Sequence, residues 1–515
     1  MLHFEDRQSG KKSGRALTAF LPFLLLLFMG CDNYAHKDRH ITMEALSDMK
    51  SPAFVFDVQD IRNQLNVLTG DHAEQPLLWI DRCGADQRAD SLLAYLQQVG
   101  EIGFSQQAFH VKAIENDLRR LRTLDFDDDK NQASKVAARL EYHLTKACVS
   151  YCKGQRFGFI NPHRLFNNLD IEKQDSTRKY VKYRGLFDVS MDLPKEHYAA
   201  EVKNKIKHDS IVEYLQEIQP RDPFYARLKT MLSQATDQAE RQRIIVNMER
   251  CRWRRRQPLT DTGKRIVVNI PAYHLYAYGP GEMLDMRVVC GAFGTKTPQL
   301  SSNIEYMQVN PQWVIPKSII DNEVARRAGD SAYFARNRYD IIDKTTNQTL
   351  DARHVSRQQL LSGNYRVAQK GGAGNSLGRI VFRFKNNFSV YLHDTSNPSA
   401  FQRLSRAMSH GCVRVAEPFE LARFVLDSPD EWLLDRIRIA MGLSAETEQG
   451  IEWLNAHPGQ ETRNKIISYV PVSPRVPLYI IYYALWPDEN GVLQTWPDVY
   501  GYDKVMWNQL KAFVS

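Results

Sequence analysis

The 515-residue sequence has little cysteine, little excess of charge and no long apolar run. Its seven cysteines are too dilute for a disulfide-stapled scaffold, so structural bridges are not required. The net charge of +8 is small for this length and does not imply a nucleic-acid partner. The apolar run at 17–29 is shorter than the about 20 residues that a transmembrane helix needs. These absences exclude a small secreted knot and a polytopic membrane protein.

What remains is typical of a globular protein. Hydrophobic residues make up 43% of the chain and charged residues 25%, which is the ordinary balance of a chain that buries several cores. At roughly 150 residues per domain, the length predicts two to four domains.

The first thirty residues differ in kind from the rest. A positive leader from Arg7 to Arg15 precedes the apolar run 17–29, and Gly30-Cys31 closes it. This end resembles a bacterial lipoprotein processing site, although Phe28 stands where Leu is usual. We therefore predict a signal peptide over 1–30, lipidation of Cys31 and a polar tether over 31–50. An ordinary secretory signal or an uncleaved anchor are the alternatives, and all three export the chain, here to the periplasmic side of a bacterial envelope.

Residues 51–250 carry a helical pattern. Apolar residues recur every three or four positions over 92–99, 114–124 and 136–148, which predicts amphipathic helices that bury one stripe each. We interpret this region as a helical scaffold domain without a catalytic constellation. Cys148 and Cys152 share one helix face and could pair or bind metal, but without a neighbouring second pair of ligands we expect two buried thiols.

A dense arginine run lies at 250–256. Because export largely denies access to nucleic acid, we interpret the run as a solvated linker end that could face a membrane. A boundary follows, and the pattern then changes to short β-branched and aromatic runs separated by Pro, Gly and Asn. The sequence thus predicts an α+β protein whose β-rich second domain spans 256–515.

A polar stretch at 317–371 interrupts the strand runs. It is too long for a plain connection, so we predict an inserted subdomain that acts as a lid.

Residues with catalytic potential concentrate near 390 and 410. A cysteine becomes a strong nucleophile as the thiolate, so a catalytic Cys412 needs an imidazole nearby, and His393 and His410 are the candidates. Tyr391 and His393 are two residues apart on a predicted strand, so their side chains share one face. Gly411 permits a tight turn whose amides could point at an oxyanion.

These residues form a recognisable signature. Fifteen residues separate His393 from Ser409, and the run Ser409 to Arg414 reads Ser-His-Gly-Cys-Val-Arg. The signature resembles the active site of the L,D-transpeptidases, with their YkuD-type catalytic domain. Segments 310–319 and 372–386 resemble two further parts of the long, multidomain branch of that family, and the entry at 243–254 and the helical half are similar to it. Members of that branch commonly carry a small peptidoglycan-binding domain, for which only 223–242 is available here, so we expect it to be absent.

The resemblance implies the chemistry. Cys412 would attack a peptidoglycan stem as nucleophile and His393 would be the general base, oriented by a backbone carbonyl rather than by the Asp394 side chain. The Gly411 and Cys412 amides would hold the oxyanion, and His410 would support that hole or the loop.

The acyl-enzyme would release D-Ala and then pass to an amine of a second stem, which links two diamino acids. Arg414, Ser409 and Tyr391 are the predicted substrate-binding residues; Arg414 suits a carboxylate but could instead brace the loop.

Two alternatives stay open. Water in place of the acceptor amine would make the chain an L,D-carboxypeptidase or a hydrolase of related wall linkages, with the same catalytic residues. A lipid-anchored wall-binding scaffold with an inactive site belongs to a different class. A papain-like protease would need another signature around the nucleophile. We expect no cofactor, no metal and no nucleic-acid partner; the expected partners are peptidoglycan stems and, through Cys31, a membrane.

Overall fold

The computed structural model describes residues 55–70, 75–127, 129–171, 182–256, 259, 263–488 and 490–514. The predicted signal peptide, the lipidation site Cys31 and the tether lie outside the described residues. Contacts divide the chain into two compact units. The first holds residues up to 153, 195–219 and 513–515, and the second holds 154–194 and 220–512. Within the described residues, no helix is both long and apolar enough to cross a membrane.

The first unit is helical, as the periodicity predicts. Asp57 and Asp86 cap the amino ends of α2 (Val58–Thr69) and α3 (Gln87–Gln97) by accepting backbone N–H bonds. Its elements are α2 (Val58–Thr69), β1 (Ile80–Asp81), β2 (Gly84–Ala85), α3 (Gln87–Gln97), η1 (Gln98–Ile102), η2 (Gln106–Phe109), α4 (Val111–Thr123), α5 (Ala133–Phe157), α7 (Tyr198–Lys207) and α8 (Ile211–Glu217); the last turn of α5 enters the second unit. On α5, Cys148 and Cys152 are fully buried free thiols with their sulfurs 3.9 Å apart, as predicted.

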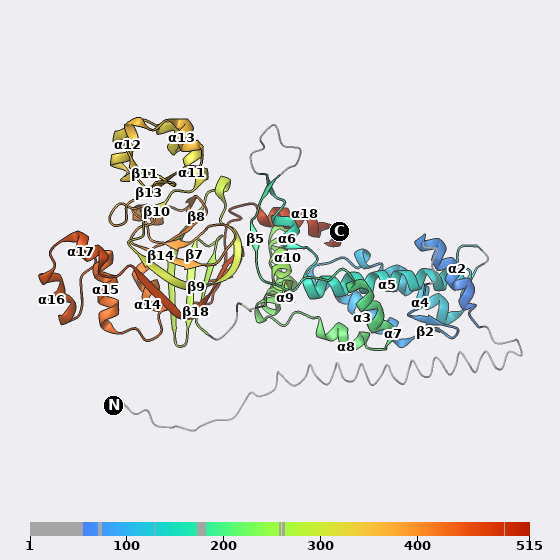
Figure 1. The fold of residues 1–515 in the computed structure, drawn as a ribbon. Coiled ribbons are helices and arrows are strands. Elements are labelled where there is room, and N and C mark those ends of the chain that lie inside the picture. The colour runs from blue at the N-terminus through green and yellow to red at the C-terminus, as the bar shows by residue number, and fades with distance from the viewer. Residues whose placement is uncertain are drawn as a thin grey trace, which may run out of the picture. The chain divides into compact units, whose positions relative to one another are not determined.

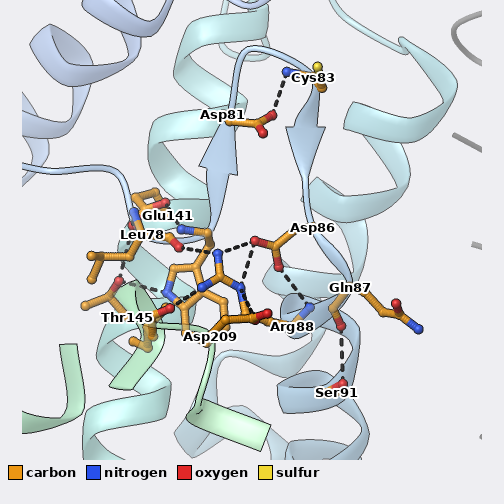
Figure 2. A network of polar contacts seen from close by, with 12 residues as sticks. Leu78, Asp81, Cys83, Asp86, Gln87, Arg88, Ser91, Glu141, Thr145 and Asp209 are labelled. Carbon is orange, nitrogen blue, oxygen red and sulfur yellow. Dashed lines mark hydrogen bonds and ion pairs between the residues drawn. The ribbon is translucent and has the colours of Figure 1, made fainter. Parts of the chain in front are cut away.

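One partly buried polar network joins α5, α3 and the segment before β1 (Figure 2). The Glu141 carboxylate on α5 accepts the backbone N–H groups of Leu78 and Trp79 at 2.8 and 3.0 Å. Arg88 on α3 donates to the Leu78 carbonyl at 3.0 Å and pairs with Asp86. Burial raises the pKa of Glu141 to about 7, although its hydrogen bonds favour the ionised form.

The second unit is built on a closed barrel (Figure 1). Eight strands follow the order β14-β15-β17-β8-β7-β6-β18-β9, and β9 pairs back with β14. Their bounds are β6 (Arg265–Asn269), β7 (His274–Gly279), β8 (Glu282–Gly291), β9 (Gln299–Val309), β14 (Ile380–Phe384), β15 (Leu392–His393), β17 (Val413–Val415) and β18 (Tyr469–Ile481). Two short strands extend the sheet: β16 (Ala407–Ser409) pairs with β8, and β5 (Phe187–Asp188) pairs with β9. The helical half followed by a barrel confirms the predicted α+β class.

Segments from the predicted scaffold pack on this barrel. They are α6 (Pro162–Phe166), β3 (Asp170–Ile171), β4 (Tyr183–Arg184), β5, α9 (Pro223–Gln234) and α10 (Gln238–Arg252), joined by β19 (Leu485–Pro487), β20 (Leu493–Thr495) and α18 (Tyr502–Val514), whose last residues belong to the first unit. Phe224 of α9 and Cys251 of α10 contact a cluster that includes Val267 and Tyr479 from the barrel strands. With this cover, β6 is buried on both faces from Ile266 to Asn269. The unit boundaries therefore differ from a single division near residue 250.

The arginine run at 250–256 corrects a prediction, because its helical part is buried rather than solvated. Arg250 and Arg252 are each 1% exposed. Arg250 donates to Asp503 at 2.5 Å, while Arg252 donates to Gln155 at 3.2 Å and to the Tyr225 hydroxyl at 3.0 Å. Partners from distant segments make this burial tolerable.

The predicted insertion is a subdomain with its own core. A four-stranded sheet of order β10-β13-β11-β12 packs with short helices around buried residues such as Phe334 and Val367. Its elements are β10 (Trp313–Val314), α11 (Lys317–Asn322), η4 (Val324–Arg327), α12 (Ser331–Arg336), β11 (Tyr339–Asp343), β12 (Thr349–Leu350), η5 (Ala352–His354), α13 (Arg357–Leu361) and β13 (Tyr365–Gln369). The first strand begins before the predicted start at 317.

Four helices that the sequence did not suggest lie between β17 and β18. They are α14 (Pro418–Val425), α15 (Glu431–Met441), α16 (Glu448–Ala456) and α17 (Gln460–Lys465); the short turns η3 (Phe293–Thr295) and η6 (Pro398–Gln402) complete the unit. Asn310 donates to carbonyls of Ala440 and Asn464, so this helical group adjoins the end of β9.

Candidate active site

The two halves of the signature meet on neighbouring strands. In the parallel pair of β15 and β17, His393 lies opposite Arg414 and Leu392 lies opposite Val413. Residues opposite each other, or two apart along an extended chain, share a face. Tyr391, His393, Cys412 and Arg414 therefore lie on one face of the barrel sheet.

His393 is buried and fixed by the backbone. It is 4% exposed, and its Nδ1 hydrogen-bonds the backbone carbonyl of Asp394. Because a carbonyl only accepts, Nδ1 carries the proton in the neutral ring and Nε2 keeps its lone pair. Burial, and next the positive charge of Arg414, lower the pKa of His393 to about 4, against the opposing effect of nearby carbonyls. The imidazole is thus neutral at neutral pH, the state that a general base requires.

The Asp394 side chain does not orient this imidazole. Its carboxylate accepts the backbone N–H of Arg379 at 2.8 Å. A Cβ at Gly378, where φ is +66°, would lie 2.4 Å from the Asp394 side chain, so only glycine fits this turn. The glycine-rich segment 372–378 therefore borders the site through Asp394, and the backbone orientation of the base agrees with the family resemblance.

The Cys412 thiol is also desolvated. Burial raises its pKa above the ordinary range, while a hydrogen bond from the Tyr391 backbone and the positive charges of Arg383 and Arg414 act in the opposite direction. At rest the site therefore holds a neutral thiol and, on the adjacent strand, a neutral imidazole.

The nucleophile loop turns at Gly411, whose φ of +113° suits glycine. The Ser409 hydroxyl accepts the Gly411 N–H at 3.2 Å and donates to the Cys412 carbonyl at 2.5 Å. Two expectations change as a result. The Gly411 amide is not free for an oxyanion in this state, and Ser409, 3% exposed, holds the loop rather than facing a substrate.

A second loop, after β8, braces the nucleophile loop. Thr297 Oγ1 donates to the Gly411 carbonyl at 2.9 Å, and Thr295 Oγ1 donates to the Ser409 carbonyl at 2.8 Å. The Ala292 N–H donates to the same Ser409 carbonyl at 2.8 Å. Sequence reasoning missed these threonines, since nothing in the local pattern couples them to a motif more than a hundred residues away.

His410 points to the insertion rather than into the turn. Its side chain is 53% exposed, and its Nε2 lies 2.9 Å from Glu323 Oε1, which follows α11. The contact makes His410 a junction between the nucleophile loop and the inserted subdomain, closer to the predicted loop support than to a direct oxyanion contact.

Two guanidinium groups flank the site. Arg414 is half-buried, its Nε is buried without a hydrogen-bond partner in the described part of the chain, and burial lowers its pKa. Arg383 of β14, which sequence reasoning missed, stacks over the Tyr391 ring at 4.0 Å and donates to Gln308 at 2.7 Å. Tyr391 thus contacts Arg383, and Arg414 adds a second positive charge to this face of the sheet. Among the described residues, no cluster of three or more His, Cys, Asp or Glu side chains could hold a metal ion.

Two parts of the chain match known protein families. Residues 263–439 match the family described as the L,D-transpeptidase catalytic domain (YkuD), and residues 71–232 match a family described as the Scaffold domain. A protein of Haemophilus influenzae named "Putative L,D-transpeptidase" is 26% identical over 323 residues, which cover 60% of this chain and 60% of that protein.

Among solved structures, an L,D-transpeptidase from Mycobacterium smegmatis is 13% identical and covers 43% of this chain and 60% of that one. The TM-score between the two structures is 0.19. The two family matches show that the chain carries an L,D-transpeptidase catalytic domain (YkuD) after an N-terminal Scaffold domain.

Proposed function

We propose that this protein is a peptidoglycan L,D-transpeptidase that links diamino acids of two stem peptides through a thioester on Cys412. The observation that carries the proposal is the placement of Cys412 and His393 on one face of adjacent paired strands, with the imidazole held through Nδ1. A thiol beside a fixed neutral imidazole is the arrangement that cysteine acyl transfer needs.

In the first step, the Cys412 sulfur attacks the carbonyl between the diamino acid and the terminal D-Ala of a tetrapeptide stem. His393 Nε2 accepts the thiol proton as the C–S bond forms, and the amide bond to D-Ala breaks. His393 then gives the same proton to the leaving nitrogen, so D-Ala departs with an uncharged amino group. The rest of the stem remains on Cys412 as a thioester. In a site with a neutral thiol and imidazole, proton transfer accompanies attack instead of preceding it.

Backbone amides would stabilise the oxyanion. With the Gly411 N–H bonded to Ser409, we assign the Cys412 N–H as the first donor. Recruitment of Gly411 would require the Ser409 hydroxyl to give up its 3.2 Å contact. The positively charged guanidinium of Arg414, on the same face as Cys412, would bind a substrate carboxylate, such as that of the terminal D-Ala.

In the second step, the side-chain amine of another stem attacks the thioester carbonyl. His393 accepts the amine proton, the C–S bond breaks, and the thiol is regenerated as the cross-link forms. Water in place of that amine gives a tripeptide, which is the carboxypeptidase alternative. The insertion, joined to the nucleophile loop at Glu323 and His410, is the candidate lid over this reaction.

The location of the protein is part of the proposal. The leader before Cys31 favours export and lipid attachment, which would hold the catalytic domain at the periplasmic side of the envelope, where stem peptides are.

Purified protein incubated with disaccharide-tetrapeptides, followed by mass spectrometry, tests the activity. We expect cross-linked dimer, free D-Ala and a thioester adduct on Cys412. Cys412→Ala should abolish all three without loss of cooperative unfolding, and Cys412→Ser should fail similarly because a hydroxyl is harder to activate. Tripeptide without dimer would favour the carboxypeptidase. No product from the wild type, with stems still bound, would favour an inactive wall-binding scaffold.

A further inference from the structure

A buried ion pair lies directly behind the brace of the nucleophile loop. Lys296 stands between Thr295 and Thr297, and its side chain is only 4% exposed. The Nζ lies 2.7 and 2.6 Å from the two carboxylate oxygens of Asp170, whose side chain is 20% exposed. The Phe293 ring covers the ammonium at 4.3 Å. A lysine this buried needs its counterion, so Asp170 determines where Lys296 sits.

The carboxylate comes from a hairpin outside the barrel. Asp170 on β3 lies opposite Arg184 in the antiparallel pairing of β3 with β4. The Arg184 side chain donates to the Gly294 carbonyl at 2.6 Å. Both hairpin strands lie within 71–232, the part that matches the Scaffold domain, although they pack in the same compact unit as the barrel. The hairpin therefore grips the loop at Gly294 and at Lys296.

The loop at 291–297 is closely packed and has little room to move. A Cβ at Gly291 would lie 2.1 Å from the Thr295 carbonyl oxygen, so the loop is folded tightly on itself. The Tyr500 hydroxyl donates to the Gly291 carbonyl at 2.6 Å and accepts the Thr297 N–H at 3.1 Å. Displacement of Lys296 would consequently move the threonines on either side.

Those threonines hold the nucleophile. Thr295 and Thr297 donate to the carbonyls of Ser409 and Gly411, the residues that form the turn before Cys412. The contacts thus run without a break from Asp170 through Lys296 and the threonines to the nucleophile loop.

We propose that Asp170 is a positioning residue for Cys412: through Lys296, the scaffold hairpin sets the register of the nucleophile loop. The inference rests on the proposed function only in taking Cys412 as the nucleophile. Neither residue touches the reacting atoms, so their effect is on the orientation of the thiol and its amide. A displacement near 1 Å at a reacting group can cost about 100-fold in rate.

The variants separate positioning from stability. Asp170→Asn removes the carboxylate charge at constant size, and Asp170→Glu keeps it as the conservative rescue. Asp170→Asn leaves the buried Lys296 ammonium without its counterion, which could unfold the loop. The double variant Asp170→Asn/Lys296→Met therefore removes both charges together. Asp117→Asn is the matched control, since Asp117 is a 3%-exposed carboxylate paired with Arg139 in the other unit, at 2.5 and 2.8 Å.

Two reactions of Cys412 are followed by mass spectrometry in full-length protein: acylation by a carbapenem, which requires an oriented thiol and oxyanion donor, and alkylation by iodoacetamide, which does not. We expect Asp170→Asn and the double variant to lose about 10- to 100-fold in the acylation rate constant, with alkylation changed less than about threefold. Asp170→Glu should recover most of the loss. Asp117→Asn should lower the melting temperature and leave both rates unchanged.

The proposal would be overturned if the double variant melts cooperatively and is acylated by the carbapenem at the wild-type rate. Equal losses in Asp117→Asn and Asp170→Asn would do so as well, because general destabilisation would then explain both. Failure of the proposed function is distinguishable: it would appear as wild-type protein that forms no thioester from stems, whatever the Asp170 variants do with the carbapenem.

Discussion

From the neutral resting state of the Cys412 thiol and the His393 imidazole, we predict how the reactivity of Cys412 depends on pH. Burial moves the pKa values of the two groups apart: that of His393 falls to about 4, and that of Cys412 rises above the ordinary thiol range. A proton therefore stays on sulfur throughout the neutral range. The opposite order would make an imidazolium–thiolate ion pair that is reactive at all pH values between the two.

The magnitude follows from the titration. A thiol at the ordinary pKa of about 8.5 is about 3% thiolate at pH 7, and a raised pKa makes this fraction smaller. Because the thiolate is the nucleophile, the alkylation rate of Cys412 should rise about tenfold per pH unit, or about 100-fold from pH 6 to pH 8. His393→Ala should change the alkylation rate at each pH by less than about threefold, since the thiol proton stays on sulfur and is not transferred to His393 in the resting state. It should depress carbapenem acylation by about 10² or more, because general-base help is needed in the transition state.

Iodoacetamide labelling, quantified on individual peptides by mass spectrometry, provides the assay. The exposed Cys83 is an internal reference in every sample, and the fully buried Cys290, whose pKa is raised to about 12, reports any unfolding. A profile for Cys412 that stays flat between pH 5 and pH 9 in the wild type would refute the neutral-pair reasoning. A larger acylation loss from His410→Ala than from His393→Ala would reverse the assignment of the base.

Two further predictions concern the surroundings of the site, and a third concerns Glu141 in the helical unit. Glu323→Gln and His410→Ala should each lower cross-linking of stems several-fold and by similar factors, with a double variant no worse than either, because both remove one exposed contact; additive losses in the dimer assay would argue against a shared role. Replacement of 317–371 by a short Gly/Ser linker should impair stem processing far more than carbapenem acylation, and equal losses in a variant that still melts cooperatively would contradict the lid interpretation. Glu141, whose pKa is raised from 4.5 to about 7, contributes stability that is present below pH 4.5 and is lost as the pH rises through 7, by about 3 kcal/mol. Glu141→Gln should flatten the unfolding free energy between pH 5 and pH 8 in urea titrations, and an unchanged slope would mean that the carboxyl is ionised throughout.

Much of the fold is predictable from local patterns. The stripes at 92–99, 114–124 and 136–148 became α3, α4 and α5, and the short β-branched and aromatic runs became β6 to β9. Strands β15 and β17, with two and three residues, are too short for any periodicity to reveal. The site was nevertheless found, because its motif reflects chemistry rather than secondary structure.

What the sequence could not predict depends on partners that are distant along the chain. A run of arginines looks solvated until Asp503 and Gln155 are brought against it. The hydroxyl of Ser409 looks available for substrate until folding places the Gly411 amide on it. In both cases the residue type was interpreted without the neighbour that decides its role.

The pairing of β5 with β9 has a practical consequence for dissecting this protein. Phe187 and Asp188 add a parallel strand beside Gln299 and Leu300, and the Phe187 ring packs within 5.7 Å of Trp253 at the end of α10. A fragment cut at residue 263, where the match to the catalytic domain begins, would leave that backbone edge unpaired and would strip the aromatic cover from it. Such a fragment should aggregate, and the smallest soluble catalytic piece should begin before α6.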